Sequence, residues 1–138
     1  MRNPFAGPLV ALLAALYLVV LGSLAGEWAS VFHKFTGNMW FYFGHQGYEY
    51  IDLGRVWQIA LFGGLLLWLF LVGRAVWPAF KQPGDHRPLL GLFVMSLVSI
   101  GGFYGAGLMW GQKTSIPIVE YWRWWVVHLW VEGFFELF

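Results

Sequence analysis

Three apolar runs without a charged residue set the strongest limit on how this chain can fold. They occupy residues 8–26, 56–73 and 89–111. At a rise of 1.5 Å per residue, each run makes a helix of about 27–35 Å, close to the roughly 30 Å hydrocarbon core of a bilayer. The runs therefore predict three membrane-spanning helices.

The composition supports this prediction and excludes other classes of protein. The chain is 59% hydrophobic and 11% charged, whereas soluble domains carry about 25% charged residues. Its ten Trp and six Tyr fit the aromatic belts at membrane surfaces. A net charge of +1 without a basic patch argues against nucleic acid as a partner. The absence of Cys excludes disulfides and thiolate-bound metals or clusters.

We predict an all-α, multi-pass transmembrane bundle that forms one unit. About four helices are expected, at residues 8–30, 47–78, 88–111 and 117–138. Pro78 should end the second helix, because proline removes a backbone donor and clashes with the preceding turn. The last helix is still apolar at Phe138, so we expect the chain to be a fragment of a larger catalytic domain.

Glycines in the third predicted helix are spaced to let another helix approach closely. They are Gly101, Gly102, Gly105 and Gly107.

The last predicted helix carries ionisable residues inside an apolar, aromatic stretch. His128, Glu132 and Glu136 follow one another at intervals of four. Ionisable groups are costly within a membrane and are candidates for function there. On an α-helix, a spacing of four gives about 40° of rotation and about 6 Å of rise. His128 and Glu132 could therefore bind one metal ion from a single helix, and adding a carboxylate to imidazole favours iron over copper.

Other readings of this pair follow from the residues alone. A histidine and a carboxylate can also form a hydrogen bond that holds helices together in a non-catalytic scaffold. Carboxylate-bridged di-iron bundles use Glu-x-x-His, with the opposite order and a spacing of three. Zinc proteases need His-Glu-x-x-His, which this chain lacks.

The residues around the pair point to a family. The run from Tyr121 to Glu136 is Tyr-Trp-Arg-Trp-Trp-Val-Val-His-Leu-Trp-Val-Glu-Gly-Phe-Phe-Glu. It closely resembles the signature of the large subunit of bacterial nitric oxide reductases, relatives of the haem-copper oxidases. Residues 22–28 and 44–58 are similar to the quinol-oxidising, single-chain branch of that family. In a haem-copper oxidase, the alternative family, a Tyr would stand in place of Glu132.

The resemblance implies an enzyme of the bacterial inner membrane that reduces two NO to N2O and water with electrons from quinol. It implies His128 and Glu132 as ligands of a non-haem iron beside haem b3, and a low-spin haem b. Glu136 would then be a proton donor. No His-His pair is present, so the other iron ligands and the haem ligands would come from the remaining helices of the parent chain. We therefore expect the segment alone to be inactive.

A second candidate site lies in the polar connection before residue 55. Glu49 and Asp52 offer clustered carboxylate oxygens, which suit calcium. The resemblance implies a calcium ion held by a glutamate near here, and Glu49 is the preferred ligand, with Asp52 next. The alternative is an ion pair of either carboxylate with Arg55.

The remaining polar and aromatic residues have simpler interpretations. Tyr121, Trp122, Trp124 and Trp125 are expected to anchor the last helix at the membrane surface. Arg123 among them is expected to reach the surface or to pair. Glu27 and Glu120 are interpreted as boundary carboxylates, and His33, His45 and His86 as loop residues.

Overall fold

The computed structural model describes residues 6–47 and 52–136 and is all-α over these ranges. It contains five α-helices: α1 (Ala6–Val31), α2 (Met39–Phe43), α3 (Arg55–Lys81), α4 (Arg87–Phe103) and α5 (Ile116–Trp124). A 3₁₀ turn, η1 (Tyr104–Leu108), extends α4, and a π-helix, η2 (Trp125–Glu136), extends α5. Extended pairing in the described ranges is limited to an isolated bridge between His45 and Leu53. The prediction of an all-α fold is confirmed.

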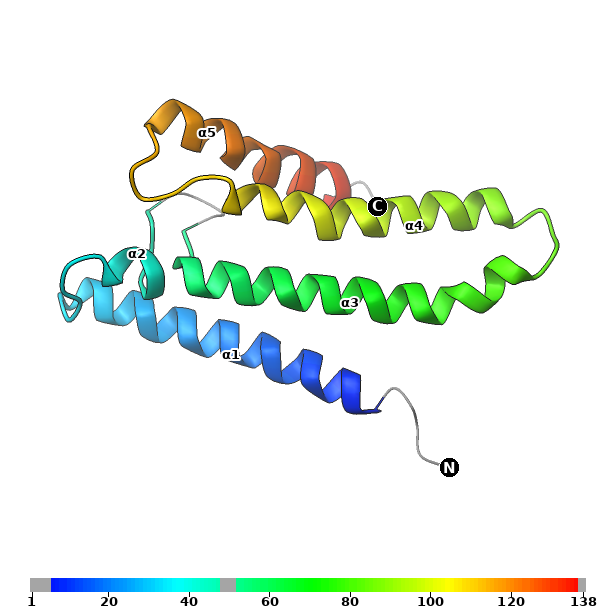
Figure 1. Cartoon of the computed structure of the whole chain (residues 1–138), viewed down its shortest axis with the longest axis horizontal. Helices are drawn as coiled ribbons and strands as arrows, with labels where there is room; N and C mark the ends of the chain where they lie inside the picture. Colours follow the sequence, from blue (N-terminus) through cyan, green and yellow to red (C-terminus); the bar gives the residue numbers. More distant parts are fainter. Residues whose placement is uncertain (1–5, 48–51, 137–138) are drawn as a thin grey trace.

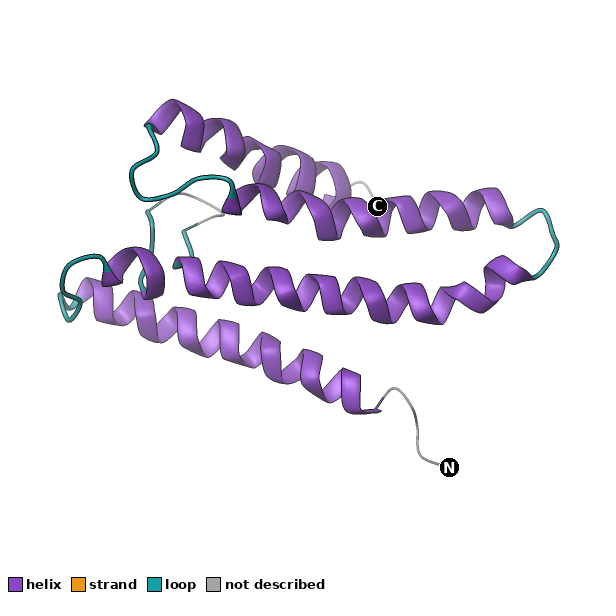
Figure 2. Cartoon of the chain, viewed as in Figure 1, coloured by secondary structure: helices purple, strands orange, loops and turns teal. Residues whose placement is uncertain are grey.

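The long helices lie roughly antiparallel, with α3 between α1 and α4 (Figure 1). The segments Ala6–Val31, Arg55–Lys81 and Arg87–Leu108 are long and apolar enough to cross a membrane. They match the three charge-free runs. The short helix α2 and the connection before α5 lie at the same end of the molecule, and α5–η2 then returns along α4 (Figure 2).

The second long helix has different ends from those predicted. It begins at Arg55 and not near residue 47, because the preceding backbone is bonded elsewhere. The N–H of Gln46 donates to the carbonyl of Asp52 at 2.6 Å. At its other end the helix passes through Pro78 and continues to Lys81. A proline so close to a helix end costs few backbone hydrogen bonds, and prolines are frequent in membrane helices.

The third and fourth predicted helices also depart from regular α-helix. The third predicted helix changes to 3₁₀ winding at η1 and ends before residue 111. The fourth begins at Ile116, close to the prediction, but from Trp125 it winds as a π-helix with i→i+5 hydrogen bonds. The structure describes it only to Glu136.

Glycines mark where helices approach closely. A Cβ at Gly101 would lie 3.2 Å from the side chain of Leu69, and one at Gly105 would lie 3.2 Å from the ring of Phe62. These two positions confirm the expected close contact of the third helix, here with α3, whereas a Cβ at Gly102 would meet nothing within 4 Å. A contact that was not predicted lies on α1, where a Cβ at Gly26 would fall 1.7 Å from the carbonyl oxygen of Phe43.

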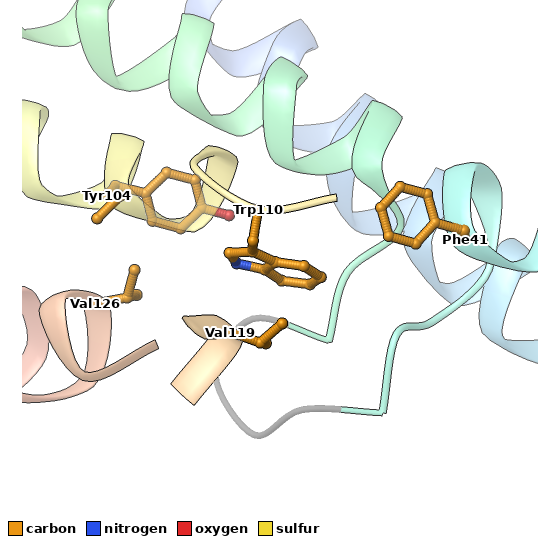
Figure 3. Packing of buried hydrophobic residues seen from close by; sticks show 6 residues of the cluster. Phe41, Tyr104, Trp110, Val119 and Val126 are labelled. Atoms are coloured by element: carbon orange, nitrogen blue, oxygen red, sulfur yellow. The ribbon is translucent and has the colours of Figure 1, made fainter. Parts of the chain in front are cut away.

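The buried core lies at the end of the molecule that holds α2. Its fully buried members come from α2, η1, the following loop, α5 and η2: Phe41, Tyr104, Ala106, Trp110, Val119 and Val126. Figure 3 shows the indole of Trp110 among Phe41, Tyr104 and Val119. The rings of Phe41 and Trp110 meet edge to face at 6.2 Å between centroids. This cluster fixes the start of the helix that carries His128 and Glu132.

Candidate functional site

The structure brings His128 and Glu132 into direct contact on η2. The Nδ1 atom of His128 lies 2.6 Å from Oε2 of Glu132. Their side chains are 64% and 48% exposed, so the pair faces away from the described helices. The contact lies within one helix and does not join two helices of the described chain. This geometry differs from an interhelical hydrogen bond of a scaffold.

The opposite face of η2 is packed and holds the pair in place. Val126 is fully buried and Val127 nearly so. The indole Nε1 of Trp130 donates to the carbonyl of Ile100 at 2.7 Å, and its ring lies 5.0 Å from that of Tyr104. Side chains at 126, 127 and 130 thus turn inward, while His128 and Glu132 turn outward.

The π-helical winding changes the relation of the three ionisable residues. In an α-helix, a step of four residues overshoots one turn by about 40°. A π-helix has wider turns, so the same step falls short of a full turn. His128 and Glu132 still meet, and Glu136 lies exposed further along the same segment. Each of Glu132 and Glu136 is therefore rotated back around η2 relative to the residue four positions earlier, whereas in the predicted α-helix it would be rotated forward.

An aromatic cavity of about 380 Å³ adjoins the imidazole. It is lined by Tyr121, Trp124, Trp125, His128 and Leu129. The ring of Trp124 meets that of His128 edge to face, with 5.5 Å between centroids. One wall of the site is thus mostly apolar and aromatic.

The other histidines of the chain lie apart from this pair. His33 follows the end of α1, and the Nδ1 of His45 accepts a hydrogen bond from the N–H of Gly47 at 2.9 Å. The Nε2 of His86 lies 3.2 Å from the carbonyl of Ala79 at the opposite end of the bundle. Within residues 6–47 and 52–136, no group of three or more His, Asp or Glu side chains could hold a metal ion. Further ligands to His128 and Glu132 are not supplied by this part of the chain.

Only part of the predicted calcium site lies within the described residues. Glu49 lies outside the described residues. Asp52 lines a small cavity of about 30 Å³ together with Glu27 and His45, which the sequence did not bring together. Glu27 therefore lies near a second carboxylate. Whether calcium binds here remains a prediction.

Arg55 does not pair with Asp52, the alternative considered from the sequence. Arg55 is 9% exposed, and its guanidinium turns to backbone carbonyls instead. The Nη1 donates to Gly107 at 2.8 Å, and the Nη2 donates to Trp110. Its Cζ also lies 4.7 Å from the ring centroid of Trp110 and 5.3 Å from that of Phe41. Gly107 and Trp110 lie more than fifty residues away along the chain, which is why local spacing did not predict these hydrogen bonds.

The aromatic run before His128 divides into two groups. Trp122 and Trp125 pack against the buried core, and the ring of Trp125 lies 5.7 Å from that of Phe103. Tyr121 and Trp124 are exposed, as expected of surface anchors. Arg123 pairs with Glu120, with Nη2 at 2.9 Å from Oε2, which confirms that Arg123 pairs.

The donors of the pair suit a transition metal. Two ligands bonded at about 2.0–2.2 Å to one ion lie about 3 Å apart, whereas the two donor atoms here are 2.6 Å apart in a direct ion-pair contact and would separate slightly to hold an ion. Their half-exposed position leaves one side open for other ligands. The residues present therefore fit part of a metal site that uses one nitrogen and one oxygen donor. No model of a known protein family matches the chain.

Proposed function

We propose that this chain is a membrane segment of a bacterial nitric oxide reductase of the quinol-dependent, single-chain type. In this proposal His128 and Glu132 are two ligands of its non-haem iron. The reaction is reduction of two NO, with two electrons and two protons, to N2O and water. The electrons would come from quinol through a haem b, and the enzyme would lie in the inner membrane.

The observation that carries the proposal is the contact of His128 with Glu132 at 2.6 Å within the run from Tyr121 to Glu136. The resemblance of that run to the reductases rests on residue order, and the contact adds a geometry suited to a shared ion. Glu132 also distinguishes the two related families, because an oxidase would carry Tyr at this position.

The depth of the pair supports a functional role. Trp130 lies between His128 and Glu132 in sequence and bonds to Ile100. Ile100 lies within the span Arg87–Leu108, about 12 Å or more from either end. Ionisable side chains at such a depth are costly in hydrocarbon and face protein or a water-filled cavity. The exposed face of η2 is therefore expected to be covered by the remaining helices of the parent chain, which would supply the other iron ligands and the haem ligands.

Each side chain has a separate task in this proposal. A bound iron, beside haem b3, would supply the redox chemistry. His128 contributes a neutral nitrogen donor, and Glu132 contributes a negative oxygen donor that offsets the charge of the ion in a low-dielectric setting. Trp124 packs on the imidazole and limits its rotation. Glu136 lies exposed on the same segment, and in this proposal it delivers a proton.

The test is turnover by the intact protein purified from its membrane. Quinol-driven consumption of NO, with N2O as product, is expected, together with little reduction of O2. Reduction of O2 as the main activity would favour an oxidase. The absence of both activities in protein that retains its haems would contradict the proposal.

A further inference from the structure

We infer that Arg55 is a positioning residue for the His128–Glu132 site. Its buried guanidinium joins the start of α3 to the carbonyl end of the α4–η1 helix, and that end supports η2. The role toward a metal rests on the proposed function, whereas the role in placing η2 does not.

The position of Arg55 is not explained by its own helix. It is the first residue of α3, where the helix dipole disfavours a cation by about 0.3–1 kcal/mol. It is also buried, and removing a guanidinium from water is costly unless its donors are satisfied. Local helix formation would favour Asp, Ser or Glu here, so the reason for an arginine must lie in its distant contacts.

Both hydrogen bonds of Arg55 go to the carbonyl end of the α4–η1 helix. The last carbonyls of a helix have no N–H partner within it. Arg55 donates to Gly107, inside η1, and to Trp110, just beyond it, from two nitrogens of the same planar group. The rings of Phe41 and Trp110 lie within cation–π distance of the charge. One side chain therefore ties together α2, α3 and the end of α4–η1, and its positive charge suits the carbonyl end of a helix.

The same helix end forms the support of η2. Tyr104 begins η1 and is 3% exposed. Its ring lies 5.0 Å from that of Trp130, the residue midway between His128 and Glu132. Val126 of η2 packs in the same cluster as Trp110. Because protein interiors are close-packed, a shift of residues 104–110 must move the inner face of η2 and hence the outward direction of the pair.

Residues 1–138 contain no Cys, so spin labels can be attached to introduced cysteines once any cysteine elsewhere in the intact protein has been replaced. In the intact protein, Leu21→Cys on α1 and Ile118→Cys on α5, the helix that η2 continues, place two spin labels at positions that are exposed in the described chain and lie outside the His128–Glu132 site. Pulsed electron resonance then measures the distance distribution between them, with iron content determined on the same samples. The unmodified background should give a narrow, single-peaked distribution.

Arg55→Met and Arg55→Lys are compared with Arg87→Met. Arg87 is the matched control, because it is also the first residue of its helix and donates to a carbonyl, that of Gln82, but is exposed. Arg55→Met should broaden or shift the distribution and lower iron affinity by about tenfold. Arg55→Lys should give a smaller change of the same kind, because an ammonium keeps the charge but lacks the planar fork. Arg87→Met should leave both readouts unchanged.

The two readouts separate the inference from the proposed function. If both Arg55 variants give the same distance distribution as Arg87→Met, the inference is overturned, whatever the iron content. If the Arg55 variants change the distribution but the unmodified protein holds no iron, Arg55 positions η2 and the proposed function is wrong. If Arg55→Met does not fold, the Arg55→Lys distribution decides alone.

Discussion

The core around Arg55 and the outward face of η2 both combine ionisable side chains with aromatic rings, but only the first is buried. At the first, a charged side chain is 9% exposed and bonds to two backbone carbonyls between aromatic rings. At the second, His128 and Glu132 satisfy each other while remaining 64% and 48% exposed. The difference indicates that the described residues complete their own structural core, whereas they leave the ionisable pair largely uncovered.

Substitutions on the outward face of η2 should affect activity more than stability, and substitutions in the core should do the reverse. In the intact protein, His128→Ala and Glu132→Ala should each abolish NO reduction. Neither side chain belongs to the buried core of the described residues, so each change should lower the free energy of unfolding by less than the removal of a core ring does. Turnover and thermal unfolding in detergent check this, with Met95→Ala, an exposed position on α4, as the control. Full turnover in both variants would show that the pair is only a helix contact.

A substitution in the core should have the opposite effect. Phe41→Ala removes a ring that is 4% exposed and contacts both Trp110 and the charge of Arg55. It should lower the free energy of unfolding by about 3–5 kcal/mol. Phe70→Ala is the control, since that ring is 61% exposed on α3. Equal losses in the two variants would mean that the cluster at the α2 end is not the stabilising core.

A substitution of Glu136 separates proton delivery from metal binding on the outward face of η2. Glu136→Gln should retain the iron and slow turnover by about a hundredfold, because an amide cannot donate a proton. Glu120→Gln, which weakens only the pair with Arg123, should leave turnover unchanged. Steady-state rates in H2O and D2O, with iron content measured beside them, are the readouts. Loss of iron in Glu136→Gln would reassign this residue from proton delivery to metal binding.

The smallest effect is expected at the close approach of α1 to the loop after α2. Gly26→Ala would place a methyl group against the carbonyl of Phe43 and should cost about 1–3 kcal/mol of stability. Gly7→Ala, on the same helix with nothing within 4 Å, should be neutral or slightly stabilising. Thermal unfolding of both variants is the measurement. A Gly26→Ala protein as stable as Gly7→Ala would place α1 further from Phe43 than the structure has it.

The features that could be predicted from sequence are those set by local composition. Charge-free runs of bilayer length identify the three long helices because burial in hydrocarbon demands both length and apolarity. The contact of His128 with Glu132 was also predictable, since side chains four residues apart are neighbours on an α-helix and still meet on the π-helix η2.

What could not be predicted depends on contacts between distant segments. The start of α3 at Arg55 reflects backbone bonds between residues 46 and 52, and the partners of Arg55 come from residues 107 and 110. The π-helical winding of η2 replaces the usual i→i+4 hydrogen bonds by i→i+5 ones, and the apolar and aromatic residues of this segment do not signal that change. Arg55 lay inside the helix predicted at residues 47–78, so its place at a helix start, against the preference of the helix dipole, became visible only in the structure.

The central claim is that His128 and Glu132 are ligands of one iron ion. The most direct test is metal analysis of the intact protein, unmodified and as His128→Ala and Glu132→Ala, with helix content checked by circular dichroism. We expect non-haem iron without copper in the unmodified protein. Iron should be lost in His128→Ala, and in Glu132→Ala it should be partly retained but with altered redox behaviour, at unchanged helix content. Copper in place of iron, no metal in the unmodified protein, or full iron with unaltered redox behaviour in both variants would contradict the claim.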